Sequence, residues 1–290
     1  MNIESLKIFC CVADELSITR AAERLGRAPS NVTTRIQQIE SEVATDLFVR
    51  INKRLSLSHA GEQFLEYAKR LIALEEEAKQ VVLGEQSGGS VRMGSMESTA
   101  ASRLPQLLAD FTKRFSQVHV SLKTAPSSRL IDEVQKGLID CAFVALHAEQ
   151  IAHDELDDRT LNSLPVWQED LVLLLPPNEA GVKDITQLET RTLAAFASGC
   201  TYRKIAETVL DIDASSEWCV QELNSYHAMI ACVAAGHCVT LLPRSVLELS
   251  PAAKTLASLN CQTIDTYLVW RQGHLTPALS RLIDVVKDTL

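Results

Sequence analysis

The chain has 290 residues, enough for two or more compact units, because single domains commonly span about 100–200 residues. Hydrophobic residues make up 46% and charged residues 22%, so a packed core can form and the charged fraction is ordinary for a globular protein. There is no apolar run of about 18 residues, and the N-terminal segment lacks the features of a signal peptide. These properties exclude a helical membrane span and predict a cytoplasmic protein with no membrane partner.

The formal net charge of −9 is unevenly distributed along the chain. Residues 1–60 carry a balance of +1, whereas the remaining residues carry −10. Within residues 20–54, seven basic side chains occur with four acidic ones. This asymmetry allows a polyanion-binding head on an acidic body, although charge alone does not establish one.

The sequence lacks the common signatures of metal sites and of catalysis. None of the eight cysteines forms a CxxC pair, and no Cys/His cluster has zinc-ligand spacing. No GxSxG, HExxH, Walker or GxGxxG motif occurs. We therefore expect no metal, no cofactor, no catalytic residues and no enzyme activity.

The N-terminal segment predicts three helices. Residues 2–15 form an amphipathic pattern with Ile3, Leu6, Phe9, Cys10 and Ala13 on one face. A second helix is expected from Ser17 as its cap to Gly26 at its end, and Pro29 suits the first turn of a third helix. The apolar residues expected to face inward in the third helix are Val32, Ile36, Ile39 and Val43.

Two short helices joined by a tight turn, the second with an exposed polar start, are typical of a DNA-binding helix-turn-helix. Hydroxyl, amide and guanidinium groups can contact base edges or phosphates, and a helix N-terminus favours phosphate. The alternative is an ordinary helical hairpin with a solvated face. The residues predicted to contact double-stranded DNA in this segment are Arg27, Pro29, Ser30, Asn31, Thr33, Thr34, Arg35 and Gln37.

A short hairpin is expected directly after these helices. In the segment RINKRLSLS the turn falls at Asn52 and Lys53, between apolar residues on either side. Arg50, Lys53 and Arg54 would project toward a phosphate backbone. The segment therefore predicts a winged helix-turn-helix, in which the wing adds backbone contacts beside the recognition helix.

The first 65 residues or so resemble the LysR-type transcriptional regulators. The matching segments are ESLKIFCCVAD, SITRAAERLGRAPSNVTTRIQQIESEV, LFVR and LSLSHAGEQFL, in the family's order and spacing. Three positions depart from the family's usual residues: Ala28 and Thr33 stand where serine is common, and Ser58 replaces a threonine. The Ala28 change removes a helix cap, which is typically worth about 1 kcal/mol.

Residues 59–83 predict a long helix, followed by a Gly/Ser-rich hinge at 84–90. Its expected apolar stripe consists of Phe64, Ala68, Leu71, Leu74, Ala78 and Val81. A stripe on an extended helix needs a partner, and a second copy is the simplest one, although packing on the chain's own body is the alternative. The family resemblance favours a dimerising linker helix and implies a homotetramer.

From residue 91 onward, strands and helices alternate, which predicts an α/β body with largely parallel sheets. The expected strands are 91–95, 118–124, 139–145, 171–176, 192–197, 218–223, 238–243 and 266–270. The expected helices are 99–115, 128–137 and those around 200–210, 225–235 and 276–289.

The resemblance continues more weakly through the body, in GSMESTAASRLPQLLADFTKRFSQVHVSL, LIDEVQKGLIDCAFVA and SYHAMIACVAAGHCVTLLP. It implies a two-lobed, periplasmic-binding-protein-like effector domain with crossing strands near 161–168 and 264–268. The full fold expectation is an all-α winged helix-turn-helix domain at 1–60, a linker helix and hinge at 61–90, and an effector domain at 91–290. Lobe I is expected at about 91–163 and 268–290, and lobe II at about 164–267.

Ligands of open α/β sheets bind at the carboxyl ends of strands, where helix N-termini favour anions. We therefore expect a small-molecule effector, of anionic character, at such junctions. Arg203 could hold a carboxylate bidentately. Plain helix capping or packing is the alternative at each position. The predicted effector-binding residues are Ser98, Thr99, Ser127, Ser128, Gly199, Cys200, Thr201, Tyr202, Arg203, Tyr226 and His227.

Cys200 is the cysteine with a second interpretation. A helix N-terminus with Arg203 nearby would lower its pKa and make it a candidate thiolate switch. The alternative is a small residue at a tight turn.

These observations predict a sequence-specific, LysR-type transcriptional regulator controlled by a small molecule. The other hypotheses are a ligand-independent DNA-binding or architectural protein, and a redox-responsive regulator acting through Cys200.

Overall fold

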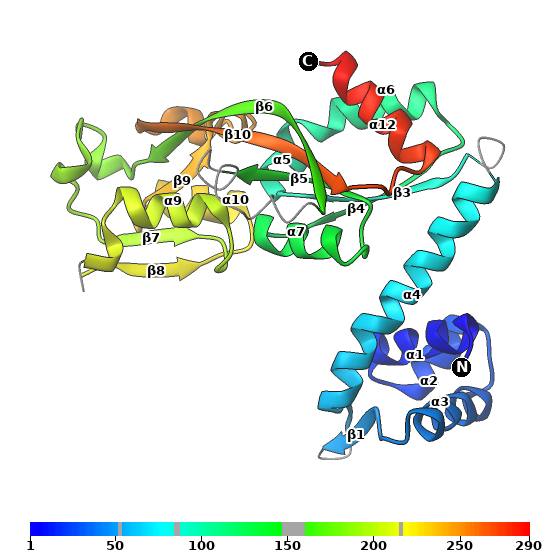
Figure 1. Ribbon diagram of the computed structural model, residues 1–290. Helices are drawn as coiled ribbons and strands as arrows, with labels where there is room; N and C mark the ends of the chain where they lie inside the picture. Colours follow the sequence, from blue (N-terminus) through cyan, green and yellow to red (C-terminus); the bar gives the residue numbers. More distant parts are fainter. Residues whose placement is uncertain (52–53, 84–87, 147–159, 215–216) are drawn as a thin grey trace. The chain divides into compact units, whose positions relative to one another are not determined.

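The computed structural model describes residues 1–51, 54–83, 88–146, 160–214 and 217–290. The chain divides into two compact units, Met1–Gly84 and Glu85–Leu290 (Figure 1). The predicted turn at 52–53, including Lys53, and residues 84–87 of the predicted hinge lie outside the described residues.

The first unit contains the three predicted helices, the hairpin and the long helix. Its elements are α1 Ile3–Glu15, α2 Ile18–Leu25, α3 Pro29–Val43, β1 Phe48–Ile51, β2 Arg54–Leu57 and α4 His59–Leu83. The two strands pair antiparallel, with Arg50 opposite Leu55. The winged helix-turn-helix predicted from the sequence is thereby confirmed.

Local sequence chemistry explains where these helices begin and end. The Asn2 side chain accepts a hydrogen bond from the Ser5 amide at 2.9 Å, and the Ser17 hydroxyl accepts from the Arg20 amide at 3.4 Å. Gly26 ends α2 with φ of 64°, a left-handed conformation that glycine adopts without steric cost. Ala28 precedes α3 without a side-chain cap, as its methyl group requires.

The core of the first unit is built around Phe9, which is completely buried. Its ring lies 5.3 Å from that of Phe48 and 4.9 Å from that of Phe64, so α1, the hairpin and α4 meet at one point. Ala21 and Ala22 are also fully buried, and their small size lets α2 approach its neighbours closely.

The second unit is an α/β domain. Its helices and strands, apart from short 3-10 turns, are β3 Ser90–Ser95, α5 Glu97–Ser102, α6 Leu104–Arg114, β4 His119–Thr124, α7 Ser127–Gln135, β5 Cys141–Leu146, β6 Leu161–Leu174, β7 Thr192–Ala195, α9 Thr201–Val209, β8 Cys219–Glu222, α10 Tyr226–Ala234, β9 Thr240–Pro243, α11 Arg244–Leu247, β10 Ser258–Arg271 and α12 Pro277–Asp288.

The main sheet has the strand order β4-β3-β5-β10-β6-β9. Only the β3–β4 and β3–β5 pairings in it are parallel, while β10 runs antiparallel to both β5 and β6, and β6 antiparallel to β9. The expectation of largely parallel sheets is therefore wrong for this sheet. The reason is that the two long strands β6 and β10 lie next to each other inside the sheet and run in opposite directions. β7 and β8 form a separate parallel pair.

The two long strands join the lobes of this domain (Figure 1). β6 and β10 pair along most of their length, from Leu161 opposite Arg271 to Leu174 opposite Ser258. The sequence predicted crossing segments at 161–168 and 264–268 and separate strands at 171–176 and 266–270. The structure corrects this, because each pair is one continuous strand.

Each lobe has its own hydrophobic core. Lobe I comprises β3, β4, β5, α5, α6, α7 and α12, and the C-terminal helix packs Leu279 and Leu282 against Phe111 of α6. Lobe II comprises β7, β8, β9, α9, α10 and α11, with Tyr202 and Leu193 in one of its buried clusters. The predicted helix at 99–115 is two helices, α5 and α6, because Pro105 cannot continue the hydrogen-bonding of α5.

Candidate functional site

The third helix, α3, separates a buried face from a polar one. Val32, Ile36 and Ile39 are buried in the head, as predicted. Thr33 and Arg35 are half-buried. The other predicted DNA-contacting residues of this segment are exposed: Arg27, Pro29, Ser30, Asn31, Thr34 and Gln37. The structure therefore places these residues on the first nine positions of α3, with Arg27 just before the helix.

Local hydrogen bonds organise part of this surface. The Thr33 hydroxyl donates to the Pro29 carbonyl at 2.9 Å, and the Arg35 guanidinium donates to the Gln38 side chain at 2.9 Å. Arg27 forms an ion pair with Glu4 on α1. Arg27 is thus partly neutralised within the head, whereas Arg35 keeps its positive charge near the polar face.

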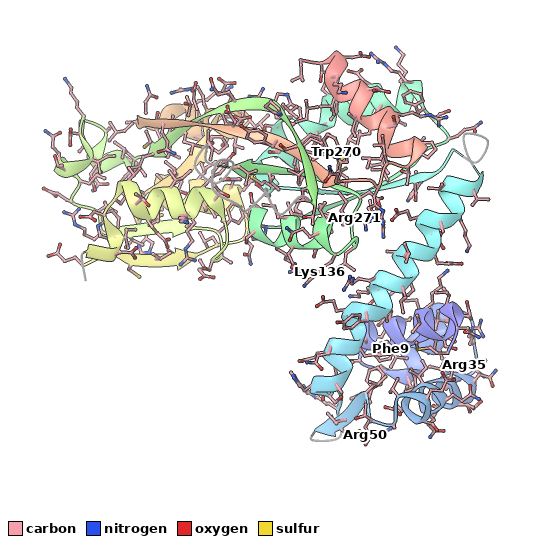
Figure 2. The ribbon with its side chains drawn as sticks, in the orientation of Figure 1. Phe9, Arg35, Arg50, Lys136, Trp270 and Arg271 are labelled. Carbon is pink, nitrogen blue, oxygen red and sulfur yellow. The ribbon has the colours of Figure 1, made fainter. Side chains whose placement is uncertain are left out.

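The wing is attached to the recognition helix by a residue that the sequence did not single out. The Glu40 carboxylate accepts from the amides of Leu47 at 2.9 Å and Phe48 at 3.1 Å. Arg50 and Arg54 are exposed on the wing (Figure 2 labels Arg35 and Arg50, both at the periphery of the helical unit).

The wing is also closed against the start of α4. The Ser58 hydroxyl accepts from the Gly61 amide at 2.9 Å and donates to the Asp46 carbonyl at 2.7 Å. A Cβ atom on Gly61 would overlap the Leu47 carbonyl, which explains the glycine after the wing.

The long helix α4 has two different apolar faces. Ala68 is fully buried and Phe64 packs into the head core, so these two residues of the predicted stripe do not face outward. A second set is exposed at heptad spacing: Tyr67 (60%), Leu71 (42%), Leu74 (55%), Ala78 and Val81 (58%). Packing on the chain's own body accounts for Phe64 and Ala68, the first two residues of the predicted stripe, and the other four are exposed to a partner.

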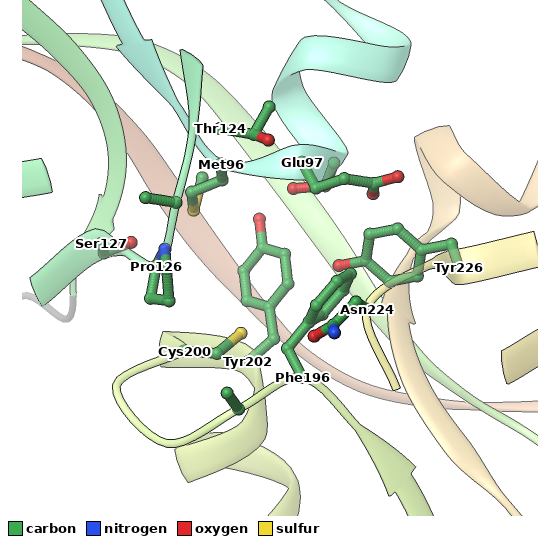
Figure 3. Close-up of a pocket in the computed structure, with 13 residues that line it drawn as sticks. Met96, Glu97, Thr124, Pro126, Ser127, Phe196, Cys200, Tyr202, Asn224 and Tyr226 are labelled. Carbon is green, nitrogen blue, oxygen red and sulfur yellow. The ribbon is translucent and has the colours of Figure 1, made fainter. Parts of the chain in front are cut away.

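The effector domain encloses a cavity of about 240 Å³. Its walls come from both lobes: the segments that follow β3 and β4 in lobe I, and those that follow β7 and β8 in lobe II (Figure 3). The lining consists of Met96, Glu97, Ser98, Thr124, Ala125, Pro126, Ser127, Phe196, Ala197, Cys200, Tyr202, Asn224 and Tyr226.

Five predicted effector residues belong to this lining: Ser98, Ser127, Cys200, Tyr202 and Tyr226. Four others line an adjacent cavity of about 320 Å³, namely Ser128, Gly199, Thr201 and Arg203. Thr99 is buried outside both linings, and His227 is exposed outside both. The sequence did not single out Glu97, Phe196 or Asn224. Each of these three residues closely follows the end of a strand, and this position is the sequence signal that could have identified it.

Two hydrogen bonds connect the lobes beside the cavities. The Thr201 hydroxyl donates to the Ala145 carbonyl at 3.1 Å, and the Ser128 hydroxyl donates to the Gly199 carbonyl at 3.2 Å. The predicted residues Thr201, Ser128 and Gly199 therefore hold one lobe against the other in this conformation.

A buried carboxylate ties the crossing strands to both lobes. Glu169 of β6 accepts from the Arg103 guanidinium of lobe I at 2.7 Å and from the Ser245 hydroxyl of lobe II at 2.7 Å. Hydrogen bonds to a charged group are among the stronger ones, so this triad restrains the lobes near the crossing strands.

Arg203 is occupied within its own lobe. Its guanidinium lies 2.7 Å from the Glu207 carboxylate, 2.9 Å from that of Glu222 and 3.2 Å from the Phe196 carbonyl. The bidentate grip on a ligand carboxylate that the sequence suggested would require these contacts to break.

Burial dominates the titration of the cavity's acidic groups. It raises the pKa values of the Tyr202 and Tyr226 phenols well above their usual range, so both are neutral donors at physiological pH. It also raises the pKa of the Cys200 thiol, against the opposing effect of the Tyr202 and Arg203 amides. The expectation of a lowered pKa at Cys200 is therefore wrong, because desolvation outweighs the helix terminus.

Within the described ranges, no group of three or more His, Cys, Asp or Glu side chains could hold a metal ion. Among the helices described there, none combines the length and apolarity needed to cross a membrane.

Comparisons with known proteins agree across the whole chain. Residues 3–62 match the family model described as bacterial regulatory helix-turn-helix protein, lysR family, and residues 84–290 match the LysR substrate binding domain. The HTH-type transcriptional regulators YusT and GltR of Bacillus subtilis (strain 168) are each 32% identical to this chain. The alignments cover 98% and 99% of this chain, and 95% and 97% of those proteins.

Solved structures show the same fold at lower identity. The LysR family transcriptional regulator CbnR is 20% identical with a TM-score of 0.72, and the match covers 100% of this chain and 99% of CbnR. Full-length CbnR in complex with its target DNA gives a TM-score of 0.70 at 20% identity, covering 100% of both chains. The chain belongs to the LysR family of DNA-binding transcriptional regulators, with a winged helix-turn-helix head and a two-lobed effector-binding domain.

Proposed function

We propose that α3 and the wing divide the work of DNA recognition. Ser30, Asn31, Thr33, Thr34, Arg35 and Gln37 read base edges in the major groove, with Pro29 at the start of the helix. Arg27, Arg50, Lys53 and Arg54 contact the phosphate backbone. The exposure of the α3 face supports this division. The first turn of α3 has no side-chain cap, Pro29 has no amide hydrogen and the Asn31 amide donates to the Ala28 carbonyl, which leaves the Ser30 amide to a phosphate.

The exposed heptad residues of α4 join two copies of the chain. Tyr67, Leu71, Leu74, Ala78 and Val81 follow the 4-3-4-3 spacing at which two helices bury a shared seam. Two linked heads read a two-fold-related site, and each raises the effective concentration of the other. A tetramer of two such pairs remains our expectation for the assembly.

The cavity of about 240 Å³ is the effector site, and its construction from both lobes is the observation that carries the proposal. A ligand that contacts both walls favours the closed arrangement of the lobes. It thereby shifts the population of DNA-bound states by its difference in affinity. The Cys200 side chain is half-buried and desolvation raises the pKa of its thiol, which does not support the redox hypothesis. No second function is favoured by an observation, and we infer a regulator without catalysis, acting in the cytoplasm where its DNA lies.

The proposal is tested by a thermal-shift screen of small metabolites on the full chain, followed by footprinting with each hit. Ala197→Phe would fill the cavity, because Ala197 is part of its lining, and should abolish both the shift and the footprint change. Ala180→Phe, at an exposed position outside the lining, is the matched control. Hits that bind Ala197→Phe with unchanged affinity would refute the assignment of the site.

A further inference from the structure

Glu97 places a carboxylate in the wall of the effector cavity. Its Oε2 atom is buried and has no hydrogen-bond partner among the described residues. Burial raises the pKa of this carboxyl group, and the attraction of the nearby His227 acts in the opposite direction. A buried acceptor without a partner costs free energy that a ligand donor would recover.

In the part of the chain that the structure describes, the remainder of the cavity lining contains no lysine or arginine. The aromatic rings of Phe196, Tyr202 and Tyr226 enter from lobe II, while Met96 and Glu97 lie on the opposite side (Figure 3). The Phe196 and Tyr226 rings meet edge to face, with centroids 4.9 Å apart. Aromatic faces attract cations and tolerate apolar groups. The buried Ser98 and Tyr202 hydroxyls of the lining also have no hydrogen-bond partner among the described residues, and each can donate or accept a hydrogen bond whatever the charge of the ligand.

The basic side chains near the 240 Å³ cavity line its neighbour instead. Arg203 and Lys204 line the adjacent cavity, and Arg203 is already paired with two carboxylates. The anionic effector expected from helix termini would therefore meet a carboxylate, aromatic rings and neutral hydroxyls in the 240 Å³ cavity, and no positive side chain among the described residues of its lining.

We propose that the effector of this cavity carries a protonated amine or an equivalent cationic N–H group, which pairs with Glu97. The inference rests on the proposed effector site and adds its chemical class. The volume of about 240 Å³ lies below the roughly 300–1,000 Å³ usual for ligand pockets, so the effector is small. Its cationic group binds lobe I through Glu97, and its apolar part packs on the rings of lobe II. One molecule thus joins both lobes.

Two sets of matched probes test the charge preference on the full-length chain by calorimetric titration. The aromatic set is benzylamine, benzyl alcohol and benzoate, and the aliphatic set is putrescine, 1,4-butanediol and succinate. Within each set the amine should bind about tenfold or more tightly than the other two, because a charged hydrogen bond to a desolvated carboxylate is worth more than a neutral one.

Glu97→Gln keeps the size of the side chain and removes its charge. It should weaken amine binding about tenfold and leave alcohol binding within about twofold. Glu189→Gln, at an exposed carboxylate outside the cavity, is the control and should change neither. Retained folding of Glu97→Gln is checked by its unfolding temperature.

The outcomes separate the inference from the site itself. If carboxylates bind as tightly as amines, if no amine binds, or if Glu97→Gln leaves amine binding unchanged, the cationic class is overturned. If carboxylates bind and Ala197→Phe abolishes that binding, the cavity is still supported as the effector site and only the proposed preference for cations is contradicted. If Ala197→Phe affects the binding of no probe, the assignment of the cavity as the effector site is contradicted as well.

Discussion

The proposed DNA-contacting face of α3 and the proposed effector cavity depend on the sequence in opposite ways. The α3 face comes from one stretch of 15 residues, whose helical period alone sets which side chains are exposed. The cavity is assembled from segments after β3, β4, β7 and β8, which lie as far apart in the chain as Met96 and Tyr226. A surface of the first kind can be read locally, whereas a site of the second kind depends on the whole sheet topology.

The largest effect should show whether the two units are stable independently. Phe9→Ala removes the ring at the centre of the head core, where it contacts Phe48 and Phe64, and should cost about 3–5 kcal/mol of head stability. Calorimetry should then show the head unfolding earlier, with the effector-domain transition unchanged. Phe111→Ala, in the lobe I core, should do the reverse. A single transition shifted equally by both variants would argue against independent units.

The next effect concerns the exposed seam of α4. Leu71→Glu with Leu74→Glu introduces like charges into the proposed dimer contact and should lower DNA affinity by about 100-fold, because each head then binds alone. Sedimentation should show the loss of the dimer. Gln63→Glu, at an exposed position about two turns before Leu71, is the control. A double variant that stays associated and binds DNA normally would place the interface elsewhere.

A smaller effect should divide the DNA-contacting residues into two classes. Arg35→Ala and Thr33→Ala should each relax base preference, with about 1–3 kcal/mol lost on the preferred site and little on random duplex. Arg54→Ala should weaken all sequences alike and reduce the log–log salt slope by about one. Binding titrations at several salt concentrations distinguish the two patterns. Equal losses on specific and random DNA for all three would contradict the assignment.

The smallest effect is a pH dependence from Glu97. Because burial raises its native pKa, the folded state holds the proton more tightly than the unfolded state does. The contribution of Glu97 is therefore greatest below its unfolded pKa of about 4.3 and is lost as pH rises through the raised value. Urea unfolding from pH 4 to 7 should show the wild type losing stability relative to Glu97→Gln. A His227→Asn background should enlarge this loss, since His227 attracts the ionised carboxylate. A pH-independent difference would contradict the assigned burial of Glu97.

Much of the fold could be predicted because its signals are local. The positions of the three N-terminal helices follow from local features and agree with the structure to within a residue or two. These features are the caps at Asn2 and Ser17, the positive φ at Gly26 and the apolar period of α3. The separate faces of α4 were not resolved, because Phe64 and Ala68 share the spacing of the exposed residues. Only the packed structure shows that these two face the core.

The predictions that fail in the effector domain depend on pairing between strands that are far apart in the chain. Glu169 and Asp170 lie between the predicted segments 161–168 and 171–176, yet β6 continues through them because β10 pairs along its length. Arg203 was expected to face a ligand, but the β7–β8 pairing brings Glu222 within 2.9 Å of its guanidinium. Glu97 was missed because the helix was expected to begin at Thr99, two residues after its actual start.

The hydrogen bonds from the Leu47 and Phe48 amides to the Glu40 carboxylate tie the wing to α3. They thereby set the spacing between the two surfaces that we propose contact DNA. A change in this spacing would break these two hydrogen bonds and leave the Glu40 carboxylate without them, which costs free energy. If α3 lies in a groove and the wing on the adjoining backbone, as we propose, the base-pair steps between them have to bend or twist to match this spacing. We therefore expect operators with easily deformed steps at those positions to be favoured, so that part of the selectivity comes from the mechanics of the DNA.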